Sequence, residues 1–285
     1  MKFGVAYNTA AQGMDPDRLV RFAQHAEACG FESFYVPEHL VLYPGASIYG
    51  NELPTTMAVA DPLDLLTFVA AATQRIVLGT AVLLLPYRHP VVLAKRLATI
   101  DALSRGRMRL LTVGLGSLAG EADAIGVDFA TRGQRADEAI DALRLLWGGG
   151  PDGVTFTGRF FRFTNVCVYP KPYEGAILPI HVAGSSRPAA RRAGARGSGY
   201  FPGGGHPDEL AERWALARAS APDPDSLEYT RWGSIELTPD RVGVYAAQGV
   251  TRLVVNPGGE LSEQLDQMSA FAERHGLRPL STTSR

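Results

Sequence analysis

Residues Arg75 to Ser117 read RIVLGTAVLLLPYRHPVVLAKRLATIDALSRGRMRLLTVGLGS, and this stretch says more about the fold than any other. It opens with a long apolar run, residues 76–85, and then turns through a short polar segment. Apolar residues with helical spacing follow, and a second apolar run, residues 109–115, ends the stretch. A strand that is apolar on both faces is typical of a parallel sheet with helices on both sides. The stretch therefore predicts a strand, a helix and a second strand parallel to the first.

Strands and helices alternate in the same way along the rest of the chain. Strict alternation predicts a parallel sheet covered by helices. About eight such units over roughly 250 residues are typical of a (β/α)8 TIM barrel, and we expect this α/β fold. An open doubly wound sheet is the alternative. The further strands are expected at residues 3–7, 33–36, 177–183, 199–201, 232–237 and 251–255.

Two segments depart from this alternation. The connection at residues 40–60 is polar and long for a link between a strand and a helix, as functional loops often are. Residues 148–176 contain VTFTGRFFRF, which predicts a hairpin inserted between the fourth helix and the fifth strand. We expect a single domain over residues 1–280 that includes this insertion, followed by a short tail at residues 281–285.

The overall composition argues against several classes of protein. The 285 residues carry 28 Lys and Arg against 29 Asp and Glu, whereas nucleic-acid-binding proteins usually carry a basic surface. The two cysteines form no CxxC pair and no disulfide framework, which fits a reducing compartment. No apolar stretch approaches the roughly 20 residues that span a bilayer, and no secretory leader is recognisable. We expect a cytoplasmic protein without a nucleic-acid or membrane partner.

Two polar residues, Glu38 and His39, directly follow the second expected strand. The catalytic residues of TIM-barrel enzymes lie at the C-terminal ends of the strands. A histidine at this position suits proton transfer near neutral pH. We therefore predict that His39 and Glu38 are catalytic. Glu38 is also a candidate for binding and orienting a cofactor. The alternative is that His39 only completes the hydrogen bonds of the loop, and that Glu38 simply caps loop amides.

Glycines follow the fourth expected strand in the segment Gly114-Leu115-Gly116-Ser117-Leu118-Ala119. The segment fits the G-x-G-x-x-A pattern of dinucleotide-binding proteins. Such a site also needs an acidic residue at the end of the next strand, and here Asp137 and Glu138 fall inside an expected helix. Small residues also let a flat ligand approach the backbone closely. The segment therefore indicates a close-approach surface and not a phosphate loop.

A candidate anion site follows the fifth expected strand at Gly184-Ser185-Ser186-Arg187-Pro188. A serine cap and a proline in the first turn begin a helix whose free N–H groups can bind phosphate, although an ordinary N-cap is the alternative.

The chain lacks suitable residues for Schiff-base catalysis and for a metal site. None of the three lysines lies at a strand end, where a Schiff-base enzyme needs one, and only Glu38, His39 and His181 lie near positions that a metal site would use. We predict no metal site.

Several segments together resemble the bacterial luciferase-like family of flavin and deazaflavin oxidoreductases, over nearly the whole chain. The similarity is greatest to the actinobacterial branch assigned to coenzyme F420, an 8-hydroxy-5-deazaflavin. The resemblance implies a homodimeric enzyme that transfers a hydride between F420 and a small organic substrate. The alternatives are an FMN-dependent monooxygenase that uses reduced flavin and oxygen, and a barrel that binds flavin or deazaflavin without turnover. The segments are VPEH (36–39), LGTAVLLLPYRHPVVLAKRLATIDALSRGR (78–107), VGLG (113–116), RGQRADEAIDALRLLW (132–147), GRFFRF (158–163), YPKP (169–172) and HVAGSSRPAARRA (181–193).

The resemblance also implies which residues form the site. The cofactor ring would lie across the mouth of the barrel, backed by a non-proline cis peptide bond between Ala81 and Val82. Glu38 and His39 match the acid–histidine pair of the family's sugar-phosphate dehydrogenases, in which the histidine is the acid/base. The remaining cofactor contacts would come from Gly114, Leu115, Gly116 and Ser117 along the ring and from Gly184, Ser185 and Ser186 at the phosphate.

One position departs from those dehydrogenases, because they have a glutamate where this chain has Ser117. The departure leaves the substrate open. Four tyrosines, Tyr7, Tyr43, Tyr49 and Tyr87, suggest a partly apolar substrate, and we predict Tyr7 and Tyr43 for the substrate pocket. Each of them could equally belong to the core or to the surface.

Overall fold

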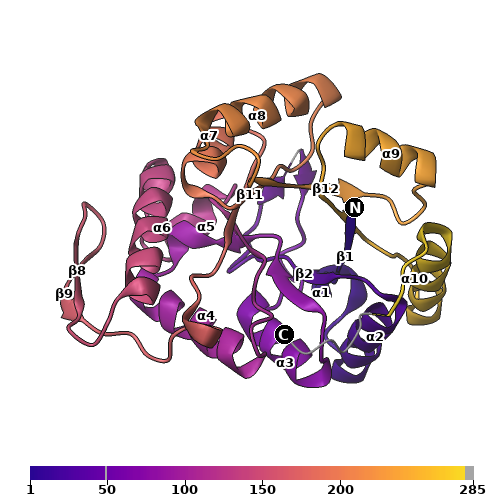
Figure 1. Cartoon of the computed structure of the whole chain (residues 1–285), viewed down its shortest axis with the longest axis horizontal. Helices are drawn as coiled ribbons and strands as arrows, with labels where there is room; N and C mark the ends of the chain where they lie inside the picture. The colour runs from indigo at the N-terminus through magenta and orange to yellow at the C-terminus, as the bar shows by residue number, and fades with distance from the viewer. Residues whose placement is uncertain (49, 280–285) are drawn as a thin grey trace.

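A computed structural model describes residues 1–48 and 50–279 of the chain. At its centre, nine parallel strand segments form a sheet that curves into a barrel surrounded by helices (Figure 1). Gly79 bridges to Leu110 and closes the ring. Because β5 and β6 are consecutive pieces of one barrel strand, the expected TIM barrel is confirmed. In sheet order the segments are β5 (Val77–Thr80), β2 (Ser33–Val36), β1 (Lys2–Ala6), β13 (Arg252–Val255), β12 (Glu228–Gly233), β11 (Gly199–Phe201), β10 (Ile180–Ala183), β7 (Leu111–Gly114) and β6 (Leu83–Leu84).

The helices around the barrel begin with clear local signals. Most have a proline in the first turn, where its fixed φ suits the helix and its missing N–H costs nothing. Asp15 and Asp61 cap the first two long helices by accepting backbone N–H groups. The covering helices are α2 (Pro16–Cys29), α3 (Pro62–Ala72), α4 (Pro90–Leu103), α6 (Arg132–Gly148), α7 (Arg187–Arg196), α8 (Pro207–Ser220), α9 (Pro239–Ala247) and α10 (Leu261–His275), and the short helices α1 (Thr9–Gln12) and α5 (Ala119–Ala124) lie at the barrel mouth.

Two strands differ from the sequence prediction. The strand expected at residues 76–85 is interrupted, because β5 ends at Thr80, a cis peptide bond joins Ala81 to Val82, and β6 then resumes. The strand expected at residues 232–237 lies earlier, at β12. This strand begins with polar residues and so lacks the apolar run by which a buried strand is recognised in a sequence. Glu228, its first residue, forms an ion pair at one end of the barrel.

The insertion between α6 and β10 contains the predicted hairpin, formed by β8 (Val154–Thr157) and β9 (Arg162–Val166). The hairpin projects away from the barrel at the left of Figure 1. The long connection after β2 contains a short antiparallel pair that was not anticipated, β3 (Ser47–Ile48) and β4 (Asn51–Glu52). The tail predicted at residues 281–285 lies outside the described residues.

Charged side chains fill the end of the barrel at which the strands begin. The guanidinium of Arg252, only 1% exposed, donates hydrogen bonds to Glu32 at 2.8 and 2.9 Å and to Glu228 at 2.6 Å. His181 lies beside them, with Nε2 3.7 Å from Oε2 of Glu228. Buried charges are tolerated when each has a close partner, as these do. The network, which we call the lower ion network, closes this end of the barrel and leaves the opposite end for a ligand.

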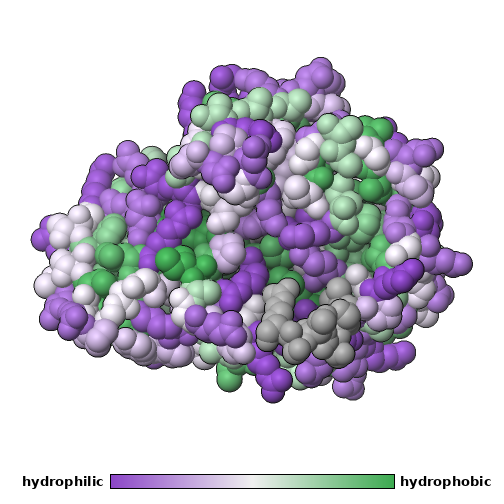
Figure 2. All heavy atoms as spheres, viewed as in Figure 1, coloured by the Kyte–Doolittle hydropathy of each residue, from purple (hydrophilic) through white to green (hydrophobic). Residues whose placement is uncertain are grey.

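The outer surface is mostly hydrophilic in the view of Figure 2, with hydrophobic residues gathered over α9. No residue of α9 is buried, and Val244 is 44% exposed. Among the described residues, none of the helices combines the length and the apolar character needed to cross a membrane.

Candidate active site

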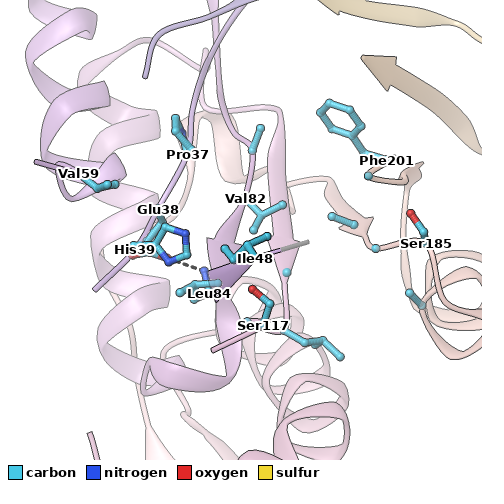
Figure 3. Close-up of a pocket in the computed structure, with 18 of the residues that line it drawn as sticks. Pro37, Glu38, His39, Ile48, Val59, Val82, Leu84, Ser117, Ser185 and Phe201 are labelled. Atoms are coloured by element: carbon cyan, nitrogen blue, oxygen red, sulfur yellow. Dashed lines mark hydrogen bonds between the residues drawn. The ribbon is translucent and has the colours of Figure 1, made fainter. Parts of the chain in front are cut away.

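The C-terminal ends of the barrel strands surround a cavity of about 700 Å³ (Figure 3). This is the face at which TIM-barrel enzymes carry their catalytic residues. The loop that contains β3 and β4 supplies one side of the cavity. The cavity is lined by eleven of the residues predicted from the sequence, namely Glu38, His39, Ala81, Val82, Gly114, Leu115, Gly116, Ser117, Gly184, Ser185 and Ser186.

The two tyrosines predicted for the substrate pocket, Tyr7 and Tyr43, are not among the residues that line this cavity. Tyr7 is fully buried, packs edge-on against Phe22 and donates a hydrogen bond to the carbonyl of Gly13. The hydroxyl oxygen of Tyr43 accepts a hydrogen bond from the N–H of Gly120, so Tyr43 contacts the first turn of α5. Tyr49, the third tyrosine considered, lies outside the described residues.

At the floor of the cavity, the side chains of Val82 and Tyr87 pack directly against two glycines, Gly114 and Gly116. A Cβ on Gly114 would lie 2.5 Å from Cγ2 of Val82, the residue that follows the cis peptide bond. A Cβ on Gly116 would lie 2.3 Å from the hydroxyl oxygen of Tyr87, and Gly116 has a φ of +80°. Only glycine adopts this φ at little cost. The side chains of Val82 and Tyr87 therefore occupy the space beside these two glycines, and a larger residue at either position would displace them.

Glu38 reaches the cavity wall, but its carboxylate is already occupied. Oε2 accepts the N–H of Leu84 at 2.5 Å, and Oε1 pairs with the guanidinium of Arg88, which also donates to Asp61 at 2.8 Å. Burial raises the pKa of Glu38, and the positive charge of Arg88 opposes this shift. The main structural effect of Glu38 is to fasten β6 to the end of β2, directly beneath the cavity floor.

His39 has a different carboxylate neighbour, Glu121 of α5. Nδ1 of His39 is 3.4 Å from Oε1 of Glu121, and one fifth of the His39 side chain remains exposed. The backbone N–H of Leu40 donates to the same carboxylate at 2.5 Å. The sequence analysis missed Glu121, because a six-residue helix has too little apolar periodicity to be recognised.

The predicted anion site forms a separate end of the cavity. Ser186 caps α7 by accepting the N–H of Ala189 at 3.2 Å, and Ser185 donates its hydroxyl to the carbonyl of Gly204. Arg132, which the sequence analysis did not single out, also lines the cavity. The Cζ atom of its guanidinium lies 3.7 Å from the centre of the Phe129 ring. Within the described residues, no carboxylate lies within ion-pair distance of Arg132, and its buried Nε has no hydrogen-bond partner. An anionic ligand would satisfy this guanidinium.

The residues considered for a metal site are not brought together. His181 belongs to the lower ion network, at the other end of the barrel from His39, and Glu38 is paired with Arg88. In the part of the chain that the structure describes, no cluster of three or more His, Cys, Asp or Glu side chains is arranged to hold a metal ion.

A model of the luciferase-like monooxygenase family matches residues 1–236. The chain belongs to this family. It is 32% identical to the F420-dependent glucose-6-phosphate dehydrogenase of Beutenbergia cavernae over 84% of the chain and 76% of that protein. Among solved structures, the monooxygenase RslO1 from Streptomyces bottropensis matches with a TM-score of 0.80 at 21% identity, covering 96% of the chain and 98% of RslO1. An F420-dependent secondary alcohol dehydrogenase matches with a TM-score of 0.76 at 17% identity, covering 96% and 97% of the two chains.

Membership of the luciferase-like monooxygenase family confirms the resemblance that the sequence showed. The cis peptide bond between Ala81 and Val82 lies where that resemblance placed it. Ser117 also lines the cavity, so a hydroxyl lies at the position where the resemblance implied a departure from the family's sugar-phosphate dehydrogenases (Figure 3). The two solved structures share the fold, and both cover nearly the whole chain.

Proposed function

We propose that the chain is an F420-dependent oxidoreductase that transfers a hydride between the deazaflavin and a small organic substrate. The observation that carries the proposal is one cavity that brings together the glycine segment after β7, the serines at the start of α7 and a histidine that follows β2. The similarity to the dehydrogenase of Beutenbergia cavernae, which is named as F420-dependent, supports the choice of cofactor.

The cavity residues fit a flat ring that carries an anionic tail. We infer that the segment at Gly114 and Gly116 lies along the ring. Arg132 donates one hydrogen bond to the carbonyl of Phe129, and its remaining N–H groups can bind an anion. We infer that Ala81, Val82 and Leu115 contact the ring. The start of α7, at Gly184, Ser185 and Ser186, would hold the phosphate together with Arg132. When bound, the deazaflavin supplies the acceptor or donor of the hydride.

The protein side chains supply the proton transfer and the positioning. His39 faces the cavity and exchanges a proton with the substrate oxygen that changes between hydroxyl and carbonyl. Glu38 acts indirectly, because its bonds to Leu84 and Arg88 fix the backbone beneath the ring. Ser117 brings no charge to the cavity, so proton transfer depends on His39.

Parallel titrations with F420 and FMN test the cofactor assignment. We expect F420 to bind with a change in deazaflavin fluorescence. Absence of F420 binding would contradict the proposal. Binding of FMN together with oxygen uptake that requires reduced flavin would instead favour a monooxygenase, because both cofactors present a flat ring and a phosphate.

The variant His39→Ala separates an enzyme from a protein that only binds the cofactor. We expect the variant to retain F420 binding and to lose turnover of alcohols or ketones by about 10²- to 10⁴-fold, the usual contribution of an acid–base group. Unchanged turnover would refute the role of His39. A parent protein that binds F420 but reduces it with none of a panel of alcohols would point to a carrier.

We further propose that the enzyme acts as a homodimer in the cytoplasm. The neighbouring helices α3 and α4 expose Phe68 and Val92, which are 47% and 60% accessible. Exposed apolar residues on adjacent helices are typical of protein–protein contacts. Light scattering after gel filtration should give twice the mass of one chain, and Phe68→Asp should shift the protein toward the monomer. A monomeric parent would contradict this arrangement.

A further inference from the structure

We propose that Glu121, and not Glu38, is the carboxylate that positions His39. Glu121 holds a proton on Nδ1 of His39 and thereby leaves Nε2 as the atom that exchanges a proton with the substrate. The catalytic part of this inference rests on the proposed function. The positioning part concerns side chains of the protein alone.

The contact geometry selects Glu121. Its Oε1 lies 3.4 Å from Nδ1 of His39, and its side chain has no exposed surface. Within the described residues, Nδ1 of His39 and Oε2 of Glu121 are buried atoms without a hydrogen-bond partner. A proton on Nδ1 therefore has one acceptor close at hand, the Glu121 carboxylate. Leu40 fixes that carboxylate in place through its backbone N–H at 2.5 Å.

Glu38 is next to His39 in sequence, but it cannot take this role. Both carboxylate oxygens of Glu38 are engaged, one by the N–H of Leu84 and the other by Arg88. Turning Glu38 toward the histidine would leave Arg88 without one of its two carboxylates and the amide of Leu84 without its acceptor.

Glu121 stands four residues after Ser117, on the same side of the barrel mouth. The carboxylate beside His39 therefore belongs to Glu121 of α5, and it does not come from position 117, which directly follows Gly116. Tyr87 lies behind the same loop, with its hydroxyl buried and without a hydrogen-bond partner in the described structure. Burial, and then the charge of Glu121, raise the pKa of Tyr87 to about 12. The phenol stays neutral, so Glu121 is the charged group that faces His39.

The resulting tautomer suits the proposed reaction. In the direction that reduces the cofactor, the carbinol C–H bond breaks and its electron pair leaves with the hydrogen as a hydride. The hydroxyl proton passes to the free lone pair of Nε2, and the C–O bond becomes a carbonyl. His39 is then an imidazolium, and the negative charge of Glu121 stabilises it. The reverse direction returns the same proton from Nε2 to the carbonyl oxygen.

The experiment is a ¹⁵N NMR measurement on histidine-labelled protein without cofactor, with His39→Asn used to assign the signals. At alkaline pH we expect His39 of the parent to carry its proton on Nδ1. The variant Glu121→Gln keeps an acceptor oxygen, so it should keep this tautomer. The variant Glu121→Met removes the acceptor and should lose the preference for Nδ1–H.

Glu27→Gln is the matched control, because Glu27 is also a buried carboxylate that accepts loop amides, those of Gln74, Arg75 and Ile76. The variant Glu27→Gln should lower the stability of the protein and leave the ¹⁵N signals of Nδ1 and Nε2 of His39 unchanged. A proton on Nε2 of His39 in the parent protein would overturn the proposal even if Glu121→Met failed to fold. Since no cofactor is present, failure of F420 binding would leave this result standing and would contradict only the proposed function.

Discussion

Replacing His181 with glutamine is expected to make the protein less sensitive to mild acid. His181 lies in β10 at the closed end of the barrel, 2% exposed, with Glu228 at 3.7 Å and Arg252 nearby. Burial lowers the pKa of His181 from 6.5 to about 4, and the attraction of Glu228 does not offset it because Arg252 acts in the opposite direction. His181 is therefore neutral in the folded protein over most of the range in which an unfolded histidine becomes charged.

The sign and size of the effect follow from this difference. Because the folded pKa is lower than the unfolded one, the unfolded chain binds a proton first as the pH falls below 6.5. The free energy of unfolding then decreases until the pH reaches about 4. The shift corresponds to roughly 3 kcal/mol in total, of which about 2 kcal/mol is lost between pH 7 and pH 5. The variant His181→Gln lacks the titrating imidazole. Its free energy of unfolding should therefore decrease by about 2 kcal/mol less than that of the parent between pH 7 and pH 5.

Urea unfolding at several pH values between 7 and 5 measures the difference. The comparison uses the change with pH, so a constant cost of the substitution cancels. His206→Gln is the control, because His206 is exposed on the surface and its loss should leave the slope of the parent unchanged. Burial raises the pKa of Glu228, but the charge and hydrogen bond of Arg252 outweigh burial and lower this pKa to about 2. The stability that protonation of Glu228 removes is therefore lost at a lower pH than the stability that depends on His181. Equal slopes for the parent and His181→Gln would refute the reasoning.

Three other substitutions test the cavity and its support. Gly116→Ala places a Cβ 2.3 Å from the Tyr87 hydroxyl at a φ of +80° and should cost about 1–3 kcal/mol in urea unfolding; a cost below that range would mean that the floor can relax. Arg88→Met leaves the buried Glu38 without its cation, whereas Asp61 keeps Arg96 at 3.6 Å, and the substitution should cost about 3 kcal/mol at pH 7. Since burial raises the pKa of Glu38 above 4.5, the penalty should be smaller at about pH 4, and a larger penalty there would contradict the assignment. Arg132→Gln should weaken F420 binding about tenfold in a fluorescence titration, and an unchanged Kd would place the anionic tail elsewhere.

The parts of the fold that were predictable are those that depend on local pattern. Alternating apolar strands and helices identified the barrel, and the rule that ligands lie at the C-terminal ends of strands placed His39, Gly116 and Ser186 in one cavity. The strand before Ala81 appeared continuous, because its apolar run does not reveal where the backbone turns.

The remaining errors arise from contacts between segments far apart in sequence. Tyr7 follows Ala6, which points into the barrel, so Tyr7 points outward against Phe22 and away from the cavity. The contact between Glu121 and the loop after β2 spans 81 residues, and no spacing rule identifies it. Arg132 likewise reads as an ordinary surface charge at the start of a helix until the cavity is seen.

The lower ion network around Arg252 also affects the kinetics of the enzyme. With that end of the barrel closed, the cavity has a single mouth, and the cofactor and the substrate must enter and leave through it. In the proposed function the cofactor ring would lie deeper, beside Gly114 and Gly116, so it would have to arrive first and depart last. Turnover should then follow a compulsory order, in which high concentrations of substrate slow the release of the cofactor beneath it.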